Sequence, residues 1–95
     1  MSKRTIERKL RRNSDRLRAL RDDLRVVDTQ LAQLADEAGD WQIRALVADS
    51  PVADVEHRHA QAHADAMTGH RRHVLASIAE LEQRQDQLLD EMSRS

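Results

Sequence analysis

The sequence contains no cysteine, tyrosine or phenylalanine, and its 95 residues include one tryptophan, one proline and two glycines. Without cysteine, disulfide bonds and thiolate metal sites are excluded. With 1% aromatic and 35% charged residues, a broad globular core is hard to build. The longest apolar run is far too short to cross a membrane, and the start of the chain lacks the apolar segment of a signal peptide. These absences predict one cytoplasmic domain without a large core.

Apolar residues instead recur in alternating steps of three and four, which is a heptad pattern typical of helices that pack along a seam. In the first half the seam residues are Ile6, Leu10, Leu17, Leu20, Leu24, Val27, Leu31, Leu34 and Ala38. In the second half they are Ala60, Ala64, Met67, Val74, Ile78, Leu81, Leu88 and Met92. The heptad pattern predicts a coiled coil made of two long helices.

The two halves match when the second is read backwards, with partners whose residue numbers add up to 98. In this register the polar exceptions Asn13 and Gln85 fall opposite each other. A buried amide needs a partner, because an unpaired one costs about 1–3 kcal/mol. The register also places Arg71 opposite Val27, where the arginine stem can reach outward. Other expected neighbours are Leu17 and Leu81, Leu24 and Val74, Lys9 and Glu91, Glu37 and His63, and Arg16 and Arg84.

The predicted fold is therefore all-α, a long antiparallel helical hairpin in a single domain. The first arm covers about residues 3–38, the tip 39–50 and the second arm about 51–93. Leu75 and Leu89 lie on one flank of the second arm, outside the seam. They are candidate partner-binding residues, and two hairpins that pair through them would form a four-helix bundle.

The tip holds the only proline and one glycine, which act as stop and start signals. Gly39 is the expected end of the first helix, whereas Ser50 and Pro51 suit the cap and first turn of the second. Between them Asp40 is expected to cap a short separate helix. The midpoint of the register is Asp49.

Trp41, the only aromatic residue, lies in this tip and has two possible roles. It can fill the end of the hairpin, since the neighbouring seam positions are small and leave room. It can also anchor a protein partner, because tryptophan is enriched at the energetic centres of interfaces. The small positions are Ala38, Ala60 and Ala64.

Basic residues concentrate in the first arm, where one arginine stripe has a seven-residue spacing. Its members are Arg4, Arg11, Arg18 and Arg25. Such a stripe is a candidate contact for nucleic-acid phosphates, ribosomal RNA in particular. The alternative is charge compensation by the acidic end of the second arm. No aromatic residue is available in this arm to stack on bases.

The remaining polar residues give no catalytic or cofactor site. His59 and His63, spaced by four with Glu56 one turn earlier, are candidate metal ligands. Pairing of these histidines with acids such as Glu37 is the simpler interpretation. The chain has neither a cysteine nucleophile nor a glycine-rich phosphate loop, so we expect no enzyme and no cofactor.

A long hairpin with an acidic tip resembles the bacterial transcription factors of the Gre and DksA type, over Ile6 to Met92 and as architecture only. The resemblance implies a hairpin that enters RNA polymerase, with Asp49 and Asp54 in the place of the tip acids. The chain lacks the globular or zinc-bearing domain of those factors. It also resembles small coiled-coil proteins of actinobacteria, which imply no activity.

These observations predict a non-enzymatic module for protein–protein interaction or structure, either a homo-oligomer or a subunit of a larger assembly. The alternative is a nucleic-acid-associated factor that acts on the ribosome or RNA polymerase through a basic arm and an acidic tip.

Overall fold

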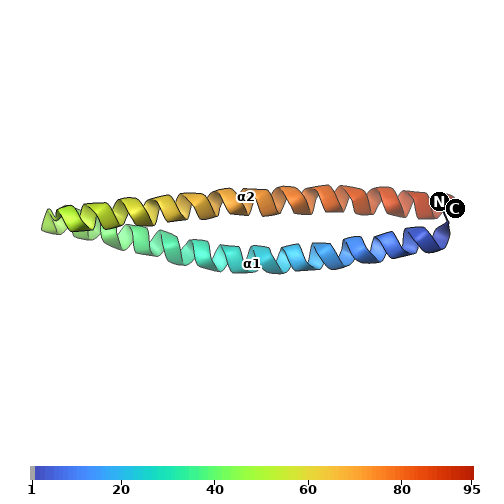
Figure 1. Cartoon of the computed structure of the whole chain (residues 1–95), viewed down its shortest axis with the longest axis horizontal. Helices are drawn as coiled ribbons and strands as arrows, with labels where there is room; N and C mark the ends of the chain where they lie inside the picture. Colours follow the sequence, from blue (N-terminus) through green and yellow to red (C-terminus); the bar gives the residue numbers. More distant parts are fainter. Residues whose placement is uncertain (1) are drawn as a thin grey trace. The chain divides into compact units, whose positions relative to one another are not determined.

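The computed structural model describes residues 2–95 and is all-α, with helix α1 at Lys3–Ala48 and helix α2 at Pro51–Arg94 (Figure 1). The two helices form the predicted hairpin. The chain divides into two compact units. The terminal unit comprises the residues up to Leu24 together with His73–Ser95, and the turn unit comprises Arg25–Arg72. In each unit a stretch of α1 lies beside a stretch of α2. No helix in the described chain is both long and apolar enough to cross a membrane.

The core of the terminal unit is aliphatic. Leu17, Val74 and Ile78 form a buried cluster, with further seam leucines packed against it. These are Leu20, Leu24 and Leu81. Leu17, Leu81, Leu24 and Val74 thus belong to one packed cluster, in agreement with the predicted register. Full burial of each aliphatic side chain stabilises the fold by about 1.5–3 kcal/mol.

An amide pair interrupts this apolar seam. Asn13 is 7% exposed, and its Nδ2 donates to Oε1 of Gln85 at 2.7 Å and to the carbonyl oxygen of Leu81 at 2.8 Å. Both amide hydrogens of Asn13 are therefore used. Among the described residues, no buried side-chain nitrogen or oxygen lacks a hydrogen-bond partner. The predicted register is confirmed by this contact.

The turn unit has a seam of smaller residues, with Val27, Ala38, Ala53 and Ala64 buried. Arg71 occupies a seam position but does not remain inside. Its Nε donates to Oδ1 of Asp28 at 2.6 Å, while both side chains stay partly exposed. An ion pair with this exposure contributes only about 0–1 kcal/mol. The ion pair allows a charged residue to occupy the seam while Val27 remains buried.

The expectation that the first helix ends at Gly39 is wrong. Helix α1 continues through Gly39 to Ala48, so no separate short helix capped by Asp40 exists. Gly39 has no positive φ, and a Cβ at that position would meet open space. The heptad explains the continuation, because Trp41 and Ala45 extend the seam beyond the glycine. Continued packing outweighs the cost of about 1 kcal/mol for an interior glycine.

The turn itself is short and lies at the predicted midpoint. Asp49 adopts the left-handed conformation with φ 47° and ends α1. The Ser50 Oγ accepts a hydrogen bond from the backbone N–H of Ala53 at 3.3 Å, which is the predicted N-cap. Pro51 is the first residue of α2, as predicted.

Removal of the amide pair tests its share in stability. We expect Asn13→Ala and Gln85→Ala each to lower the free energy of unfolding by about 1–3 kcal/mol, because each leaves a polar partner unsatisfied. The double variant should cost less than the sum of the two single changes. Urea unfolding followed by circular dichroism measures all three. Strictly additive losses would show that the two amides act independently.

Candidate interaction surfaces

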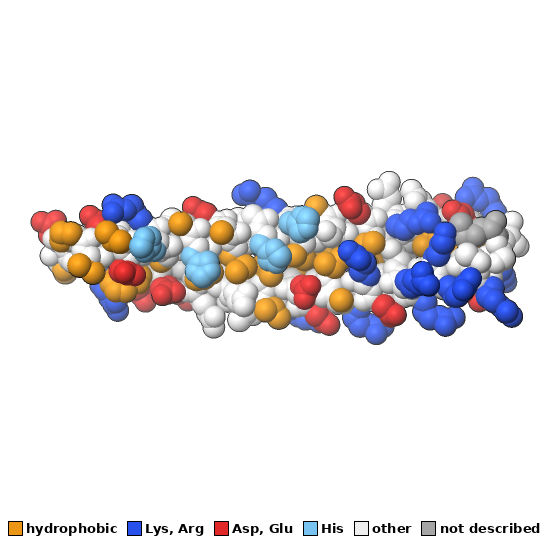
Figure 2. Space-filling model, viewed as in Figure 1, with side chains coloured by type: hydrophobic (Ala, Val, Ile, Leu, Met, Phe, Trp, Pro, Cys, Tyr) orange, Lys and Arg blue, Asp and Glu red, His pale blue; other side chains and the backbone are white. Residues whose placement is uncertain are grey.

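Large apolar side chains are exposed on both sides of the turn. We call this set the turn cap: Ile43, Leu46, Val47, Val52 and Val55, with exposures of 61%, 77%, 82%, 69% and 39%. Their positions alternate with the seam residues of the turn unit, so the helices point them away from the core. Figure 2 shows hydrophobic side chains gathered at the end that carries the turn. Clustered exposed aliphatic residues mark interaction sites more often than scattered ones do.

Trp41 lies next to the turn cap and is half-buried. The guanidinium of Arg44 lies over its ring, 4.8 Å from the centroid, a cation–π arrangement. Position 41 continues the seam and is paired by register with His57, which is also half-buried. The ring therefore occupies a seam position while part of it stays accessible.

The turn cap lies in an acidic stretch of the chain. Residues 36–58 hold six carboxylates and two arginines: Asp36, Glu37, Asp40, Asp49, Asp54 and Glu56 against Arg44 and Arg58. Asp40, Asp49 and Asp54 are exposed. An apolar surface with acidic surroundings favours a partner of complementary, basic character.

Leu75 and Leu89, the predicted partner-binding residues on α2, are less exposed than most of the turn cap. They belong to the terminal unit and are 37% and 49% exposed. They are two heptads apart, and Glu82 occupies the intermediate position, where it pairs with Arg21 at 3.8 Å. The flank is therefore apolar at two points with an ion pair between them.

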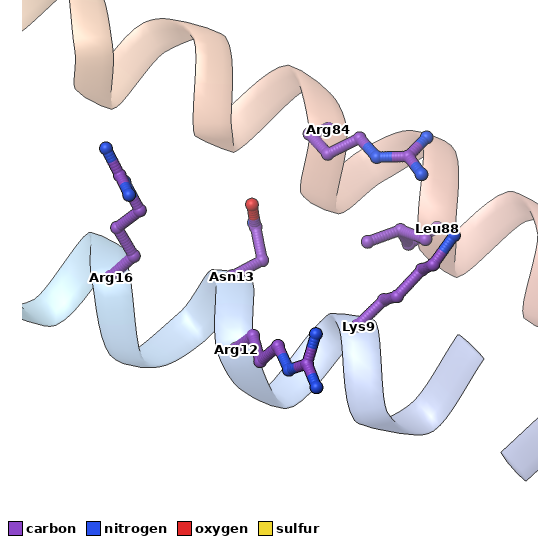
Figure 3. Close-up of a pocket in the computed structure, with 6 residues that line it drawn as sticks. All are labelled: Lys9, Arg12, Asn13, Arg16, Arg84 and Leu88. Carbon is purple, nitrogen blue, oxygen red and sulfur yellow. The ribbon is translucent and has the colours of Figure 1, made fainter. Parts of the chain in front are cut away.

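A cationic groove, which the sequence analysis did not identify as a site, opens in the terminal unit (Figure 3). Lys9, Arg12 and Arg16 of α1 line it together with Arg84 of α2, and Asn13 and Leu88 complete its lining. In Figure 3 the Asn13 side chain points towards α2 between Arg16 and Lys9. The expected proximity of Arg16 to Arg84 is confirmed. That like-charged pair was the available sequence signal for the groove.

The predicted arginine stripe lies outside this groove. Arg4, Arg11 and Arg18 are exposed residues of the terminal unit, whereas Arg25 is an exposed residue of the turn unit. None of the four lines the cationic groove. Figure 2 shows many Lys and Arg side chains near the end where the termini lie. The basic character of the first arm thus has two parts, an outer stripe and a groove shared with α2.

The histidines give a surface of a different kind. His63 lines an open groove with Glu37, which confirms their expected proximity, and Gln30, Gln33, Leu34 and Met67 complete it. His59 is exposed and Glu56 is half-buried. Throughout residues 2–95, no three His, Cys, Asp or Glu side chains come together in a way that could hold a metal ion. The candidate ligands His59, His63 and Glu56 are therefore not assembled as such a group.

No family model matches the chain, and no curated protein or solved structure is similar to it at a significant level. The two-helix hairpin agrees with the architectural resemblance to the Gre and DksA type. The function must therefore be inferred from the surfaces of the hairpin.

Trp41 is the natural spectroscopic probe of the turn unit. Because the ring is half-buried, we expect fluorescence quenching by iodide to be partial, and Trp41→Ala to lower the free energy of unfolding by roughly 1–3 kcal/mol. Trp41→Phe, the matched control, should restore most of that loss. Complete quenching with no change in stability on truncation would show that the ring contributes nothing to the seam.

Proposed function

We propose that the protein is a non-enzymatic interaction module that docks onto a protein partner through its turn cap. The observation that carries the proposal is the exposure of Ile43, Leu46, Val47, Val52 and Val55 on both sides of one turn. Because these positions lie off the seam, the hairpin would fold equally well with polar residues there. Their aliphatic character is explained by contact with something outside the hairpin.

The composition of the surface indicates what that partner offers. Aliphatic side chains require an apolar recess, and the exposed carboxylates of Asp40, Asp49 and Asp54 favour cationic groups at its rim. Aliphatic side chains supply no nucleophile, proton donor or metal ligand, so the proposal involves docking without a chemical step. Trp41, half-buried beside the cap, can add aromatic contact at the edge.

The size of the surface favours a transient complex. Burying one exposed aliphatic side chain gains at most about 1.5–3 kcal/mol, and four members of the turn cap are more than half exposed. The gross gain from these four is then at most about 6–12 kcal/mol. Lost translational and rotational freedom costs about 4–15 kcal/mol. Apolar burial alone therefore gives weak binding, and charge complementarity must supply part of the affinity.

Site-specific photocrosslinking in the producing cells tests this proposal. We expect a photoreactive amino acid at Val47 to give a discrete protein adduct, and one at Gln83, an exposed polar position on α2, to give none. Leu46→Ser with Val52→Ser should remove the Val47 adduct without changing the helix content. No adduct from Val47, or the same adduct from Gln83, would contradict docking through the turn cap.

The same experiment addresses self-association, which is the form of partnership that Leu75 and Leu89 favour. A photoreactive group at Leu75 that gives an adduct of twice the chain mass would support pairing of two hairpins in a bundle. An adduct of that mass from Val47 would make a second copy the partner of the turn cap. Light scattering of the purified protein then gives the number of chains in the complex.

A second candidate function is a nucleic-acid-associated factor. The observation that favours it is the exposed stripe of Arg4, Arg11 and Arg18, on the same unit as the cationic groove. Salt-dependent binding of RNA by the purified protein would support this function. Absence of binding at low salt would exclude it.

A further inference from the structure

We infer that the cationic groove of Lys9, Arg12, Arg16 and Arg84 is a binding site for the phosphate backbone of nucleic acid. The inference goes beyond docking through the turn cap, and it rests on the second candidate function, for which it names a site. It also differs from the sequence-based prediction, which assigned phosphate contacts to the outer stripe.

The groove is cationic, and among the described residues no ion pair joins a carboxylate to any of its four cations. Among the described residues, those that line it include four cations and no carboxylate. Three acids of the second arm line other hollows of the terminal unit. Glu82 and Asp86 line a different hollow, with Ser14 and Arg21, and Glu91 lines a third beside Ile6 and Arg94. No ion pair joins Lys9 to Glu91 within residues 2–95.

The four cations repel one another, and a bound anion would relieve this electrostatic repulsion. Like charges from two helices repel, and the register forces Arg16 and Arg84 to the same groove. A surface with no ligand would tolerate a neutral or acidic residue at any of the four positions, since none of them is fully buried. Phosphate oxygens accept paired hydrogen bonds from the planar guanidinium, which makes arginine the residue best suited to such a ligand.

The spacing also suits a chain of phosphates more than a single ion. Lys9, Arg12 and Arg16 recur in steps of three and four along one flank of α1, as the seam residues do. They span about 10 Å of helix axis at 1.5 Å per residue. Within a duplex each strand rises about 3.4 Å per nucleotide along the helix axis, so this row is as long as roughly three nucleotides of one strand. Arg84 adds a cation from α2 on the other side of the groove (Figure 3).

The other residues of the groove indicate what it does not recognise. The Asn13 amide hydrogens are both used inside the hairpin, and Leu88 is 1% exposed, so neither offers a contact to a base edge. The only aromatic residue, Trp41, belongs to the turn unit. Binding should therefore depend on phosphates and not on sequence. The exposed large apolar residues of the terminal unit, Leu75 and Leu89, do not line the groove, so it lacks the apolar anchors that a protein partner needs.

Two triple variants separate the groove from general charge. The groove variant, Arg12→Gln, Arg16→Gln and Arg84→Gln, removes all the groove arginines and leaves Lys9. The stripe variant, Arg4→Gln, Arg11→Gln and Arg18→Gln, removes the stripe arginines of the terminal unit and leaves Arg25. Each set removes three positive charges, which takes the formal net charge from −1 to −4. Fluorescence anisotropy with a labelled 20-nucleotide RNA of mixed sequence, titrated at several salt concentrations, measures binding. Circular dichroism checks that both variants keep the helix content of the parent.

We expect the groove variant to bind RNA at least tenfold more weakly and the stripe variant less than threefold. The slope of log K against log salt should fall by about 2 in the groove variant, since each phosphate contact on a single strand contributes roughly 0.7. Equal losses of RNA affinity in the two variants would show that only net charge matters. That result would contradict the groove as the binding site but leave the second candidate function in place. No RNA binding by the parent at low salt would overturn both. Equally tight binding of poly-glutamate, lost in the groove variant alone, would assign the groove to an acidic protein.

Discussion

The contact between Asn13 and Gln85 determines how the two helices of the terminal unit can align. Most seam positions are aliphatic, and aliphatic residues would accept a slip by one heptad with little loss of buried area. After such a slip Asn13 would meet Ile78 or Met92 and leave a buried amide unpaired, at about 1–3 kcal/mol. The hydrogen bonds at 2.7 and 2.8 Å in the observed alignment therefore act as a register device. Arg84 meets the cations of α1 in one groove only in this register, so the proposed phosphate site depends on it.

In the turn unit the two helices pack through smaller residues. Ala38, Ala53 and Ala64 are buried, and Asp49 takes a left-handed conformation so that the chain reverses within two residues. Since the short turn leaves no loop to cover the helix ends, apolar residues off the seam remain in solvent. The exposure of Leu46 and Val47 follows from this geometry, and their aliphatic character is what points to a partner.

The heptad spacing and the two amide exceptions were sufficient to predict the hairpin and its alignment, and Ser50 and Pro51 were sufficient to predict the start of α2. The end of α1 was predicted wrongly, because a local stop signal at Gly39 competed with a seam that continues beyond it. The turn cap and the groove are properties of the folded hairpin. The exposure of Ile43 depends on α1 continuing as a helix, and the groove depends on which flank Arg84 shares with Arg16. Taken as a pair, Arg16 and Arg84 only repel each other. The full lining of the groove shows that four cations lie together.

The absence of cysteine makes the alignment directly measurable. Ala38→Cys with Ala60→Cys joins two seam positions that the register pairs, and Ala38→Cys with Ala53→Cys joins positions one heptad out of register. Mild oxidation followed by mass spectrometry under non-reducing conditions compares the two variants, since a disulfide requires Cα atoms within about 7 Å. The account predicts rapid intramolecular closure for the first pair and none for the second. Closure of the out-of-register pair in preference to the first would contradict the alignment of α1 and α2 in the turn unit, on which the turn cap depends.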